Sequence, residues 1–564
     1  MTDDKVLNLT ASDLLVMAPE LALGIWFVLL ILLDLFLPKS VSRTWVGGLT
    51  LTALIGAFIL VLLRLMNMNG SDPVDTISIL NDSYMVDDFA SLLKLLFLAA
   101  TALIVLVSMG SVGQDKAITD KGEYFYLLLP AVIGAMTMAS SAHLMTLYIG
   151  LELLSISTYI LTGLRKKSYL SAEAAFKYVV VGSIASAFIL FGMSYLYGAT
   201  GTLQLSAVDF ATAISNRHFL AAVGLGFIIV GLAIKIAAAP FHVWAPDVYQ
   251  GAPTPIVSFL TVVSKGAAVA TIFRLLFYTS FPEFSQALMR MDYPFSYFAD
   301  DFLFGLQLIA ASSMLIGTLS ALRQKNTKRL LALSGVANAG FLVVSLTVNF
   351  GIGAMSNISF YLLVYLLMTI GAFAVHTAVS RASGHDELKS YGGLYYRAPW
   401  TAVAMTIFIL SLAGLPISAG FFGKAYILLN VVRSEEYWLA IVMVLSSVIS
   451  YYFYFGIIRQ MYMRIGAGGT AEIYKREAAG ASEFESYKPF GEGFSERSAE
   501  DIGGYTEEAD LEGGIGDPEG KVEMPLPIGI VVWSCALATL LLGLFPNLFI
   551  DFVYFVFETV EPIG

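Results

Sequence analysis

The 564-residue chain has one cysteine, Cys535, five histidines and only 13% charged residues. A single thiol cannot form an internal disulfide, and it cannot ligate an iron–sulfur cluster, which needs several cysteines. The histidines show no H-E-x-x-H or comparable metal spacing, and no G-x-G-x-x-G or Walker A loop is present. Redox cofactors, nucleotides and nucleic acid are therefore not expected to bind this chain.

The scarcity of charge accompanies an abundance of apolar residues. The chain is 57% hydrophobic, and only 13% of its residues are charged. Soluble domains carry roughly 25% charged residues. The apolar runs are long enough to cross a bilayer as helices, which takes about 20 residues. We therefore predict an all-α polytopic membrane protein. Its predicted spans lie near 14–37, 45–67, 89–111, 123–140, 142–163, 170–197, 218–240, 254–279, 302–322, 328–349, 355–380, 400–430, 436–463 and 525–557.

Loop charges predict the orientation of these spans. Alternate connections carry 16 Lys and Arg residues, from Lys39 to Arg464, and the other side carries five. Basic loops stay in the cytoplasm, so both termini are expected on the outer face of the cell (inner) membrane. The acidic N-terminus does not resemble a cleaved signal peptide. The segment 465–523 holds 15 Asp or Glu and 5 Lys or Arg. It is predicted to be a cytoplasmic loop that is either disordered or ordered against a partner.

The stretch from Gly231 to Lys265 contains the most informative pattern. An apolar helix carries Lys235, breaks at Pro240, and gives way to a polar, aromatic elbow. A second apolar helix follows, and Lys265 lies well inside it. A charge at mid-bilayer costs at least ~2.5–3.5 kcal/mol. Broken helices next to ionisable groups are typical of ion sites near the membrane midplane.

Further ionisable residues lie inside predicted spans. Glu152 is near the midplane, and such acids are functional by default, although a carboxylate that only ties helices together is the alternative. Lys177 either takes part in transport or extends its amine to the cytoplasmic surface. Lys424 follows a second break at Gly414-Leu415-Pro416 and is expected nearer the outside. A Glu152–Lys235 contact that forms and breaks would switch the proton affinity of this lysine.

The histidines and two remaining charges are weaker candidates. His143 and His242 either relay protons or bond to neighbouring helices, and both are better placed than His376. Asp247, in the elbow, is expected to cap the segment after Pro253 or to fix the loop. The charges of Lys94 and Asp34 lie near predicted helix ends and are expected to be structural.

The order of the spans suggests an internal repeat. Spans four to eight and nine to thirteen each form a block of five, and each block has its interrupted helix in fourth place. An odd number of spans inverts the second block relative to the first. The predicted units are three N-terminal helices at 1–117, a first repeat at 118–280, an inverted repeat at 300–464, the acidic loop at 465–523, and a C-terminal helix at 524–564.

Four stretches carry a resemblance to a known family. They are YLLLPAVIGAMTMASSAHLMTLYIGLELLSIS, KIAAAPFHVWAPDVYQGAPTPI, KRLLALSGVANAGF and SLAGLPISAGFFGKAYIL. Together they resemble subunit N of NADH-quinone oxidoreductase, an antiporter-like membrane subunit of respiratory complex I. The resemblance covers roughly residues 10–463 and 525–560. The elbow PFHVWAPDVYQGAPTPI is specific, because sister subunits and multisubunit sodium/proton antiporters usually carry a different one.

The resemblance implies about fourteen helices, two inverted five-helix repeats, and proton half-channels joined by a central lysine. It implies that Glu152 and Lys235 form the relay pair with Lys177 beside them, that Lys265 bridges the half-channels, and that Lys424 leads to the exit. NADH, FMN, iron–sulfur clusters and quinone would belong to partner subunits. One position departs from the family: Asn338 stands where a histidine is usual, which places a histidine relay there in doubt.

Two other functions stay open from the sequence alone. The chain would otherwise be a subunit of a sodium/proton antiporter or of a membrane-bound hydrogenase, against which the elbow argues. A structural scaffold without transport is the third reading, against which the buried ionisable groups argue.

Overall fold

The computed structural model describes residues 11–36, 38, 42–68, 77–205, 218–287, 295–348, 352–463 and 522–557. Of the predicted acidic segment 465–523, only Val522 and Glu523 are among them. The described residues are mostly helical, with one small antiparallel sheet of β1 (Ile77–Ile79) and β2 (Tyr84–Val86), in which Ser78 pairs with Met85.

The helices up to the middle of the chain are α1 (Ala11–Val16), α2 (Ala18–Phe36), α3 (Thr44–Met68), α4 (Asp88–Ser111), η1 (Val112–Gln114), α5 (Lys121–Tyr126), α6 (Leu128–Ala139), α7 (Leu144–Thr162), α8 (Tyr169–Thr200), α10 (His218–Lys235), α11 (Trp244–Gly251), α12 (Thr254–Phe259), η2 (Leu260–Ser264) and α13 (Lys265–Ala287). The later helices are α14 (Phe295–Ala321), α15 (Thr327–Thr347), α16 (Ile352–Ser383), η3 (Leu388–Tyr391), α17 (Leu394–Arg397), α18 (Pro399–Ala413), α19 (Ala419–Arg433), α20 (Tyr437–Met463), α22 (Leu526–Leu544) and α23 (Asn547–Phe557).

Twelve helical stretches of the described chain are long and apolar enough to cross a membrane. Two shorter apolar helices, Phe219–Lys235 and Pro399–Ala413, belong to the two spans that the sequence predicted to be interrupted. The all-α polytopic membrane fold is thus as predicted, while the total of fourteen spans stays a prediction.

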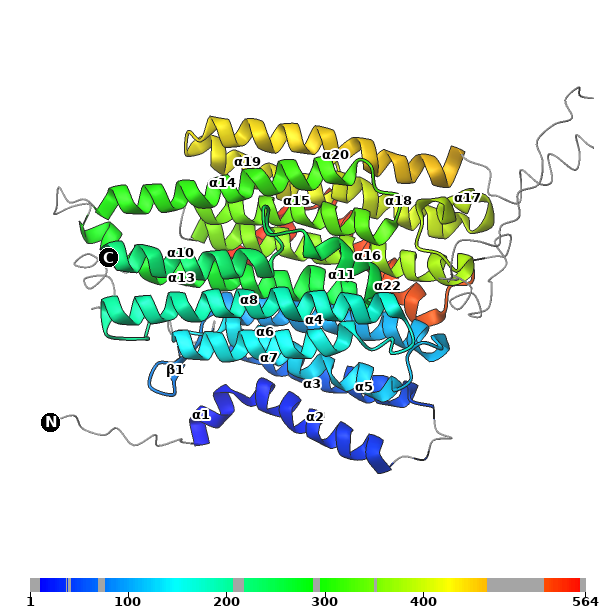
Figure 1. Cartoon of the computed structure of the whole chain (residues 1–564), viewed down its shortest axis with the longest axis horizontal. Helices are drawn as coiled ribbons and strands as arrows, with labels where there is room; N and C mark the ends of the chain where they lie inside the picture. The colour runs from blue at the N-terminus through cyan, green and yellow to red at the C-terminus, as the bar shows by residue number, and fades with distance from the viewer. Residues whose placement is uncertain are drawn as a thin grey trace, which may run out of the picture.

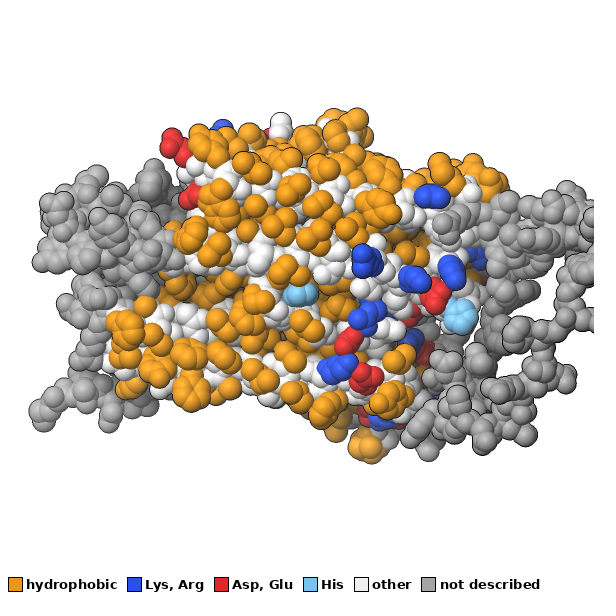
Figure 2. Space-filling view, turned by 45° about the horizontal axis from the view of Figure 1, so that its top comes forward, with side chains coloured by type: hydrophobic (Ala, Val, Ile, Leu, Met, Phe, Trp, Pro, Cys, Tyr) orange, Lys and Arg blue, Asp and Glu red, His pale blue; other side chains and the backbone are white. Residues whose placement is uncertain are grey.

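The long helices run side by side along one axis of the molecule (Figure 1). α2 lies at one edge and α20 at the other. In the most apolar stretch of each helix, only 22% of α2 and 33% of α20 is buried. The stretch from α12 into α13, α15 and most of α16 are almost wholly enclosed. Figure 2 shows a face covered by apolar side chains, with Lys, Arg, Asp and Glu gathered towards one end. Lys265 therefore lies in an enclosed interior.

The first interruption begins earlier than predicted. α10 ends at Lys235, not at Pro240, and α11 begins only at Trp244. Backbone groups freed by the break find partners inside the protein, as a spanning segment requires. The amide of Ala239 donates to Ser313 Oγ at 2.8 Å, and Ser312 Oγ donates to the Ala239 carbonyl at 2.9 Å. Both serines belong to α14, so a helix from the second half of the chain closes this break.

The second interruption separates α18 from α19, as predicted. Gly414 ends α18 with a φ of +77°, a left-handed conformation that glycine adopts without strain. Ser418 then caps α19 by accepting from the amide of Phe421 at 3.3 Å. The break therefore has its own start and stop signals in the sequence.

The helix that carries Lys265 is less regular than predicted. The sequence indicated one uninterrupted helix over 254–279. The structure has a π-helical segment, Leu260–Ser264, between α12 and α13, and Lys265 follows it directly. Such bulges frequently occur at functional sites.

Candidate functional site

Lys235 lies at the last position of α10, beside the first break. Its ammonium donates to Ser155 Oγ at 2.6 Å and to Tyr159 Oη at 3.1 Å, and both acceptors belong to α7. Its Nζ also lies 5.4 Å from the centroid of the Tyr159 ring. The residue is only 9% exposed. A buried ammonium is thus held by two neutral hydroxyls and an aromatic face.

The predicted direct contact between Glu152 and Lys235 is not formed in this conformation. Glu152 lies one helical turn before Ser155 on α7, and its carboxylate accepts a hydrogen bond from Ser186 of α8. Because Ser155 occupies the position next to the ammonium, a turn of α7 separates the two charges. The arrangement is that of an ion pair that is open.

The hydrogen-bond partners of Lys177 do not include Glu152. Its ammonium binds Glu173 at 2.6 Å and Asp247 at 2.7 Å, and it is 38% exposed. Asp247 also accepts from Arg329 of α15 at 2.6 Å. Asp247 therefore fixes the elbow to α8 and α15, which is one of the two roles predicted for it. The contacts of Lys177 favour a structural role at the edge of the site.

Lys265 is the most enclosed of the predicted site residues, at 2% exposure. Its ammonium donates to the carbonyl of Gly335, near the middle of α15, at 2.8 Å. Among the described residues no carboxylate forms an ion pair with it. Its position links α13, which ends the first predicted repeat, to α15 of the second.

Lys424 sits in α19, just beyond the second break, and is 9% exposed. Its ammonium donates to the Leu412 carbonyl at 2.9 Å, and it lies 4.9 Å from the centroid of the Phe341 ring. The carbonyl belongs to the last turn of α18, where helical acceptors are left over by the break. An interrupted helix thus supplies the lysine with its hydrogen-bond partner.

Asn338, the departure from the resembled family, lies between these lysines on α15. Its Oδ1 accepts from Tyr361 Oη at 3.1 Å, and its Nδ2 donates to Ser334 Oγ at 3.5 Å. Ser334 is also hydrogen-bonded to Tyr454. An amide does not titrate, so Asn338 holds this hydroxyl network in place and does not carry charge.

The histidines divide into three different environments. His143 caps α7, and its Nδ1 accepts from the amide of Met145 at 3.1 Å. His242 is half-buried in the elbow, and its buried Nδ1 has no hydrogen-bond partner. His376, which the sequence ranked below them, is buried and contacts Tyr391 at 2.9 Å and Asp386 at 3.2 Å. A capping role for His143 leaves its nitrogen engaged with the backbone.

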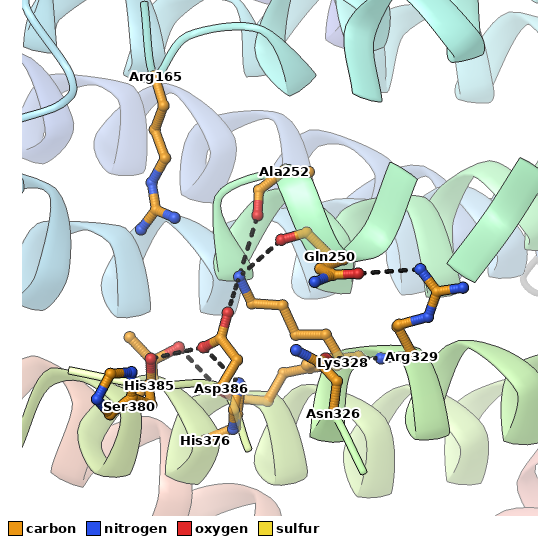
Figure 3. Close-up of polar contacts among 12 residues, drawn as sticks. Arg165, Gln250, Ala252, Asn326, Lys328, Arg329, His376, Ser380, His385 and Asp386 are labelled. Atoms are coloured by element: carbon orange, nitrogen blue, oxygen red, sulfur yellow. Dashed lines mark hydrogen bonds and ion pairs between the residues drawn. The ribbon is translucent and has the colours of Figure 1, made fainter. Parts of the chain in front are cut away.

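Sequence reasoning missed an ion pair at the base of α15. Lys328 was counted among the basic loop residues, yet it is only 1% exposed. Its ammonium binds Asp386 at 2.9 Å and the Ala252 carbonyl at 3.3 Å (Figure 3). Although burial alone raises the pKa of Asp386, the Lys328 ammonium, His376 and Ser380 hold that pKa well below its usual range. No short-range sequence signal predicts this pair, because Lys328 belongs to α15 and Asp386 to the loop after α16.

A cavity of about 580 Å³ adjoins this ion pair. Arg165, Arg381, Asp386 and Glu523 are among the charged residues that line it, and Thr254 at the start of α12 forms part of its wall. These residues come from the connections that the sequence placed on the basic side. The cavity is a polar vestibule at one end of the molecule, leading towards the helix that carries Lys265.

Lys94 was predicted to be a structural residue near a helix end, and its surroundings are a second buried network. Its ammonium binds Glu20 at 2.8 Å and Tyr84 Oη at 2.6 Å, and its side chain has 0% exposure. Glu20 was not singled out from the sequence. Asp34 forms an ion pair with Arg43 at 2.8 Å, as expected for a charge at a helix end.

Comparison with known proteins identifies relatives along nearly the whole chain. Residues 141–450 match the family model described as NADH:quinone oxidoreductase/Mrp antiporter, TM. NADH-quinone oxidoreductase subunit N of Paenibacillus sp. (strain JDR-2) is 50% identical over 96% of this chain and 95% of its own length. The subunit N of Brevibacillus brevis is 47% identical over 82% of this chain and 89% of its own.

Solved structures share the fold. A chain of respiratory complex I from Thermus thermophilus with bound aureothin is 29% identical, with a TM-score of 0.68 over 94% of this chain and 98% of that one. A chain of the Mrp complex from Dietzia sp. superposes with a TM-score of 0.74 over 98% of both chains, at 18% identity. At that identity the second likeness concerns the fold alone.

Proposed function

This chain belongs to the subunit N family of NADH-quinone oxidoreductase, the antiporter-like, proton-translocating membrane subunits of complex I, and we propose that Glu152, Lys235, Lys265 and Lys424 carry its protons. The observation that supports this assignment is the burial of three lysines whose ammonium groups are bonded to neutral acceptors. A lysine without a carboxylate partner is free to release and regain a proton, whereas a tight ion pair would hold the proton in place.

The proposed route runs from the basic end of the bundle to the opposite side. Protons enter through the vestibule beside Asp386, whose charged walls hold water near the start of α12. They then pass along the buried row, which consists of Lys235, Lys265 and Lys424, and leave towards the outer face. Lys177 is assigned to the support of the elbow, and His143 and His242 stay outside the main route.

The partners follow from this assignment. NADH, FMN, iron–sulfur clusters and quinone are handled by other subunits of the complex, since this chain has a single cysteine and no nucleotide motif. The chain therefore contributes to the enzyme as a translocase subunit of the inner membrane. Redox energy reaches the buried row through changes in neighbouring charges and helix positions.

Glu152 provides the test. In the intact complex reconstituted in liposomes, Glu152→Gln removes the charge that attracts Lys235 and is expected to lower the protons pumped per NADH. Glu123→Gln is the matched control, because Glu123 lies near Lys166 at the basic end, outside the row. Pumping at the parent's level by an assembled Glu152→Gln complex would refute the assignment.

A further inference from the structure

The buried network around Lys94 lies at the end of the bundle opposite the vestibule. Lys94 is near the start of α4, whereas the carbonyl of Gly110, near the end of α4, accepts from Arg381 of the vestibule at 2.6 Å. The Lys94 ammonium lies 2.8 Å from Glu20 Oε1 of α2. The hydroxyl of Tyr84 donates to Glu20 at 2.7 Å and accepts from Lys94 at 2.6 Å. Glu20, Tyr84 and Lys94 therefore form an outer triad, named for the face that the predicted orientation gives this end.

The outer triad is enclosed, yet its hydrogen bonds are incomplete. The side chains of Lys94 and Glu20 are 0% and 4% exposed, and ionisable groups inside a membrane protein are functional by default. Glu20 Oε2 is buried without a hydrogen-bond partner, and so are Nε and Nη2 of Arg64. Arg64 donates through Nη1 to the Val16 carbonyl at 2.6 Å, one turn before Glu20. An ordered water between carboxylate and guanidinium would satisfy both groups and lead from the triad to the outer end of α2.

The helix that carries Lys265 packs against the helix that carries Lys94. A Cβ atom added at Gly266, next to Lys265, would meet Phe97 of α4 at 2.9 Å and Leu362 of α16 at 3.5 Å. α4 and α16 run in the same direction, since the hydrogen bond between Arg381 and Gly110 joins their last turns. Lys94 precedes Phe97 by about one turn. It therefore lies about one turn further towards the outer end than the contact beside Lys265.

Buried hydroxyls without partners lie at the same level. Ser359 precedes Leu362 on α16 by about one turn, and Ser91 precedes Lys94 on α4 by about one turn. Ser91, Ser356 and Ser359 are at most 7% exposed, and none of their Oγ atoms has a hydrogen-bond partner. Such groups are normally satisfied by protein or by ordered water. Ordered water is therefore expected between the surroundings of Lys265 and the outer triad.

We propose that the outer triad is a second exit for protons from Lys265, separate from the exit at Lys424. The Lys94 ammonium gives a proton to the Glu20 carboxylate across 2.8 Å, which leaves a neutral amine and a neutral carboxyl group. The carboxyl group turns and releases this proton to the water at its unpartnered oxygen, and so to the outer face. The Lys265 ammonium then gives its proton, over the water between the helices, to the amine of Lys94. Lys94 and Glu20 regain their charges, one proton has left Lys265, and Tyr84 is a positioning residue that holds the pair.

This inference rests on the proposed function for the proton on Lys265, and a double variant tests it in the intact complex in liposomes. Glu20→Gln together with Lys94→Gln removes both charges and keeps groups that form hydrogen bonds. Replacing both members of a buried ion pair is tolerated far better than removing one. Assembly and melting temperature are therefore expected to match the parent. The rate of NADH-driven pumping is expected to fall, because one of two exits is closed.

A third substitution shows whether there are two exits. Lys424→Ala alone closes the other exit and should pump faster than Lys265→Ala, because Lys265 supplies both exits. Adding the Glu20→Gln and Lys94→Gln pair to Lys424→Ala should lower pumping to the level of Lys265→Ala.

A matched control uses an ion pair at the other end of α2. Asp34 and Arg43 lie 2.8 Å apart, and Asp34→Asn with Arg43→Gln should pump like the parent. Infrared difference spectra of the parent during turnover should contain the carbonyl band of a protonated carboxyl group. The Glu20→Gln and Lys94→Gln variant should lack this band, which an ion pair with a purely structural role would not produce.

The outcomes separate this inference from the proposed function. Parental pumping by the assembled Glu20→Gln and Lys94→Gln variant, or no such band, would overturn the second exit and leave the lysine row intact. A Lys424→Ala complex that pumps no faster than Lys265→Ala would do the same. Parental pumping by Lys265→Ala would overturn the proposed function as well.

A second pair of substitutions keeps the test open if the glutamine variant does not assemble. Glu20→Leu with Lys94→Met fills the same space with apolar side chains, a replacement that buried ion pairs often tolerate. It is expected to lose pumping as the glutamine variant does. Failure of both variants to assemble would assign the pair to folding and would also overturn the second exit.

Discussion

Three of the buried lysines, Lys235, Lys265 and Lys424, share one chemical feature: each ammonium donates to a neutral oxygen. Lys265 donates to a carbonyl near the middle of α15, and Lys424 donates to a carbonyl at the end of α18. Lys235 donates to two hydroxyls of α7. A neutral amine still carries N–H groups, so these hydrogen bonds survive the loss of a proton. The side chain therefore keeps its place in both protonation states. Lys328, in contrast, forms an ion pair with Asp386.

Lys235 gives the sharpest prediction at this scale. If it only balances Glu152, arginine should replace it, but a guanidinium stays charged at a pKa above ~12 and cannot release a proton. We expect Lys235→Arg to lower NADH-driven pumping strongly, with a smaller loss of quinone reduction. The measurement uses an assembled complex whose thermal stability matches the parent, which controls for the larger side chain. Pumping at the parent's level would show that Lys235 is structural.

The identity of the buried charges was predictable from the sequence, but their partners were not. Lys235, Lys265 and Lys424 stand out because each interrupts an apolar run. The acceptors Ser155, Gly335 and Leu412 carry no such signal, since serines and backbone carbonyls occur throughout the chain. Lys235 bonds to Ser155, which lies one turn of α7 after Glu152. Sequence spacing does not resolve a difference of one helical turn.

At the scale of elements, the two breaks differ in how they are closed. The α10–α11 break borrows Ser312 and Ser313 from α14, whereas the α18–α19 break uses its own Gly414 and Ser418. Proline and glycine marked both breaks in the sequence. The first was placed too late because proline marks where a helix cannot continue, whereas α10 had already ended at Lys235. The π-helical segment before Lys265 contains no distinctive residue and escaped prediction.

The contact between α15 and the loop after α16 yields a prediction about pH. Asp386→Asn leaves the buried Lys328 cation without its counter-charge, and removing one partner of a buried pair costs about 3–5 kcal/mol. The pKa of Asp386 is depressed in the folded protein, so its contribution is complete above the unfolded pKa of about 3.9, starts to decrease below it, and is lost only as the pH falls through the depressed folded pKa. Melting temperatures of parent and variant should therefore differ at pH 7, and the difference should shrink progressively as the pH is lowered below about 4.

Glu387→Gln is the control for this comparison, because Glu387 is the exposed neighbour of Asp386. It should melt like the parent at every pH. A difference between Asp386→Asn and the parent that does not shrink at all as the pH is lowered from about 4 through the depressed pKa of Asp386 would mean that packing, not charge, sets the effect.

At the scale of the whole molecule, the orientation remains to be measured. Cysteines at Ser168 and Ser383 should react with a membrane-impermeant thiol reagent from the cytoplasm, and one at Ser71 from the outside, because basic loops are retained inside. Ser71 lies outside the described residues, so Asn81, exposed next to the β1–β2 hairpin, offers a second outer position. The natural Cys535 is buried and gives little background. Labelling of positions 71 and 383 from one side would contradict the predicted topology.

The fold class and family were predictable at this scale because hydropathy and the elbow motif both extend over long stretches. What the sequence did not predict is the packing of the centre. The stretch from α12 into α13, together with α15 and α16, is enclosed by its neighbours, yet its apolar composition resembles that of the largely exposed α2 and α20. Apolar residues satisfy lipid and protein neighbours alike, so hydropathy does not separate the two.

Under the proposed function, the three lysines of the buried row lie at similar depths in the membrane, and this has an electrical consequence. Lys235 bonds near the middle of α7, Lys265 near the middle of α15, and Lys424 at the break between α18 and α19. A membrane voltage acts only on movement along the membrane normal, with about 2.3 kcal/mol per charge for each 100 mV crossed. Under the proposed function, proton transfer along the row runs parallel to the membrane plane, so the voltage does almost no work on it. Voltage then opposes only uptake and release, and electrical recordings of the intact complex should find their voltage dependence in these two steps.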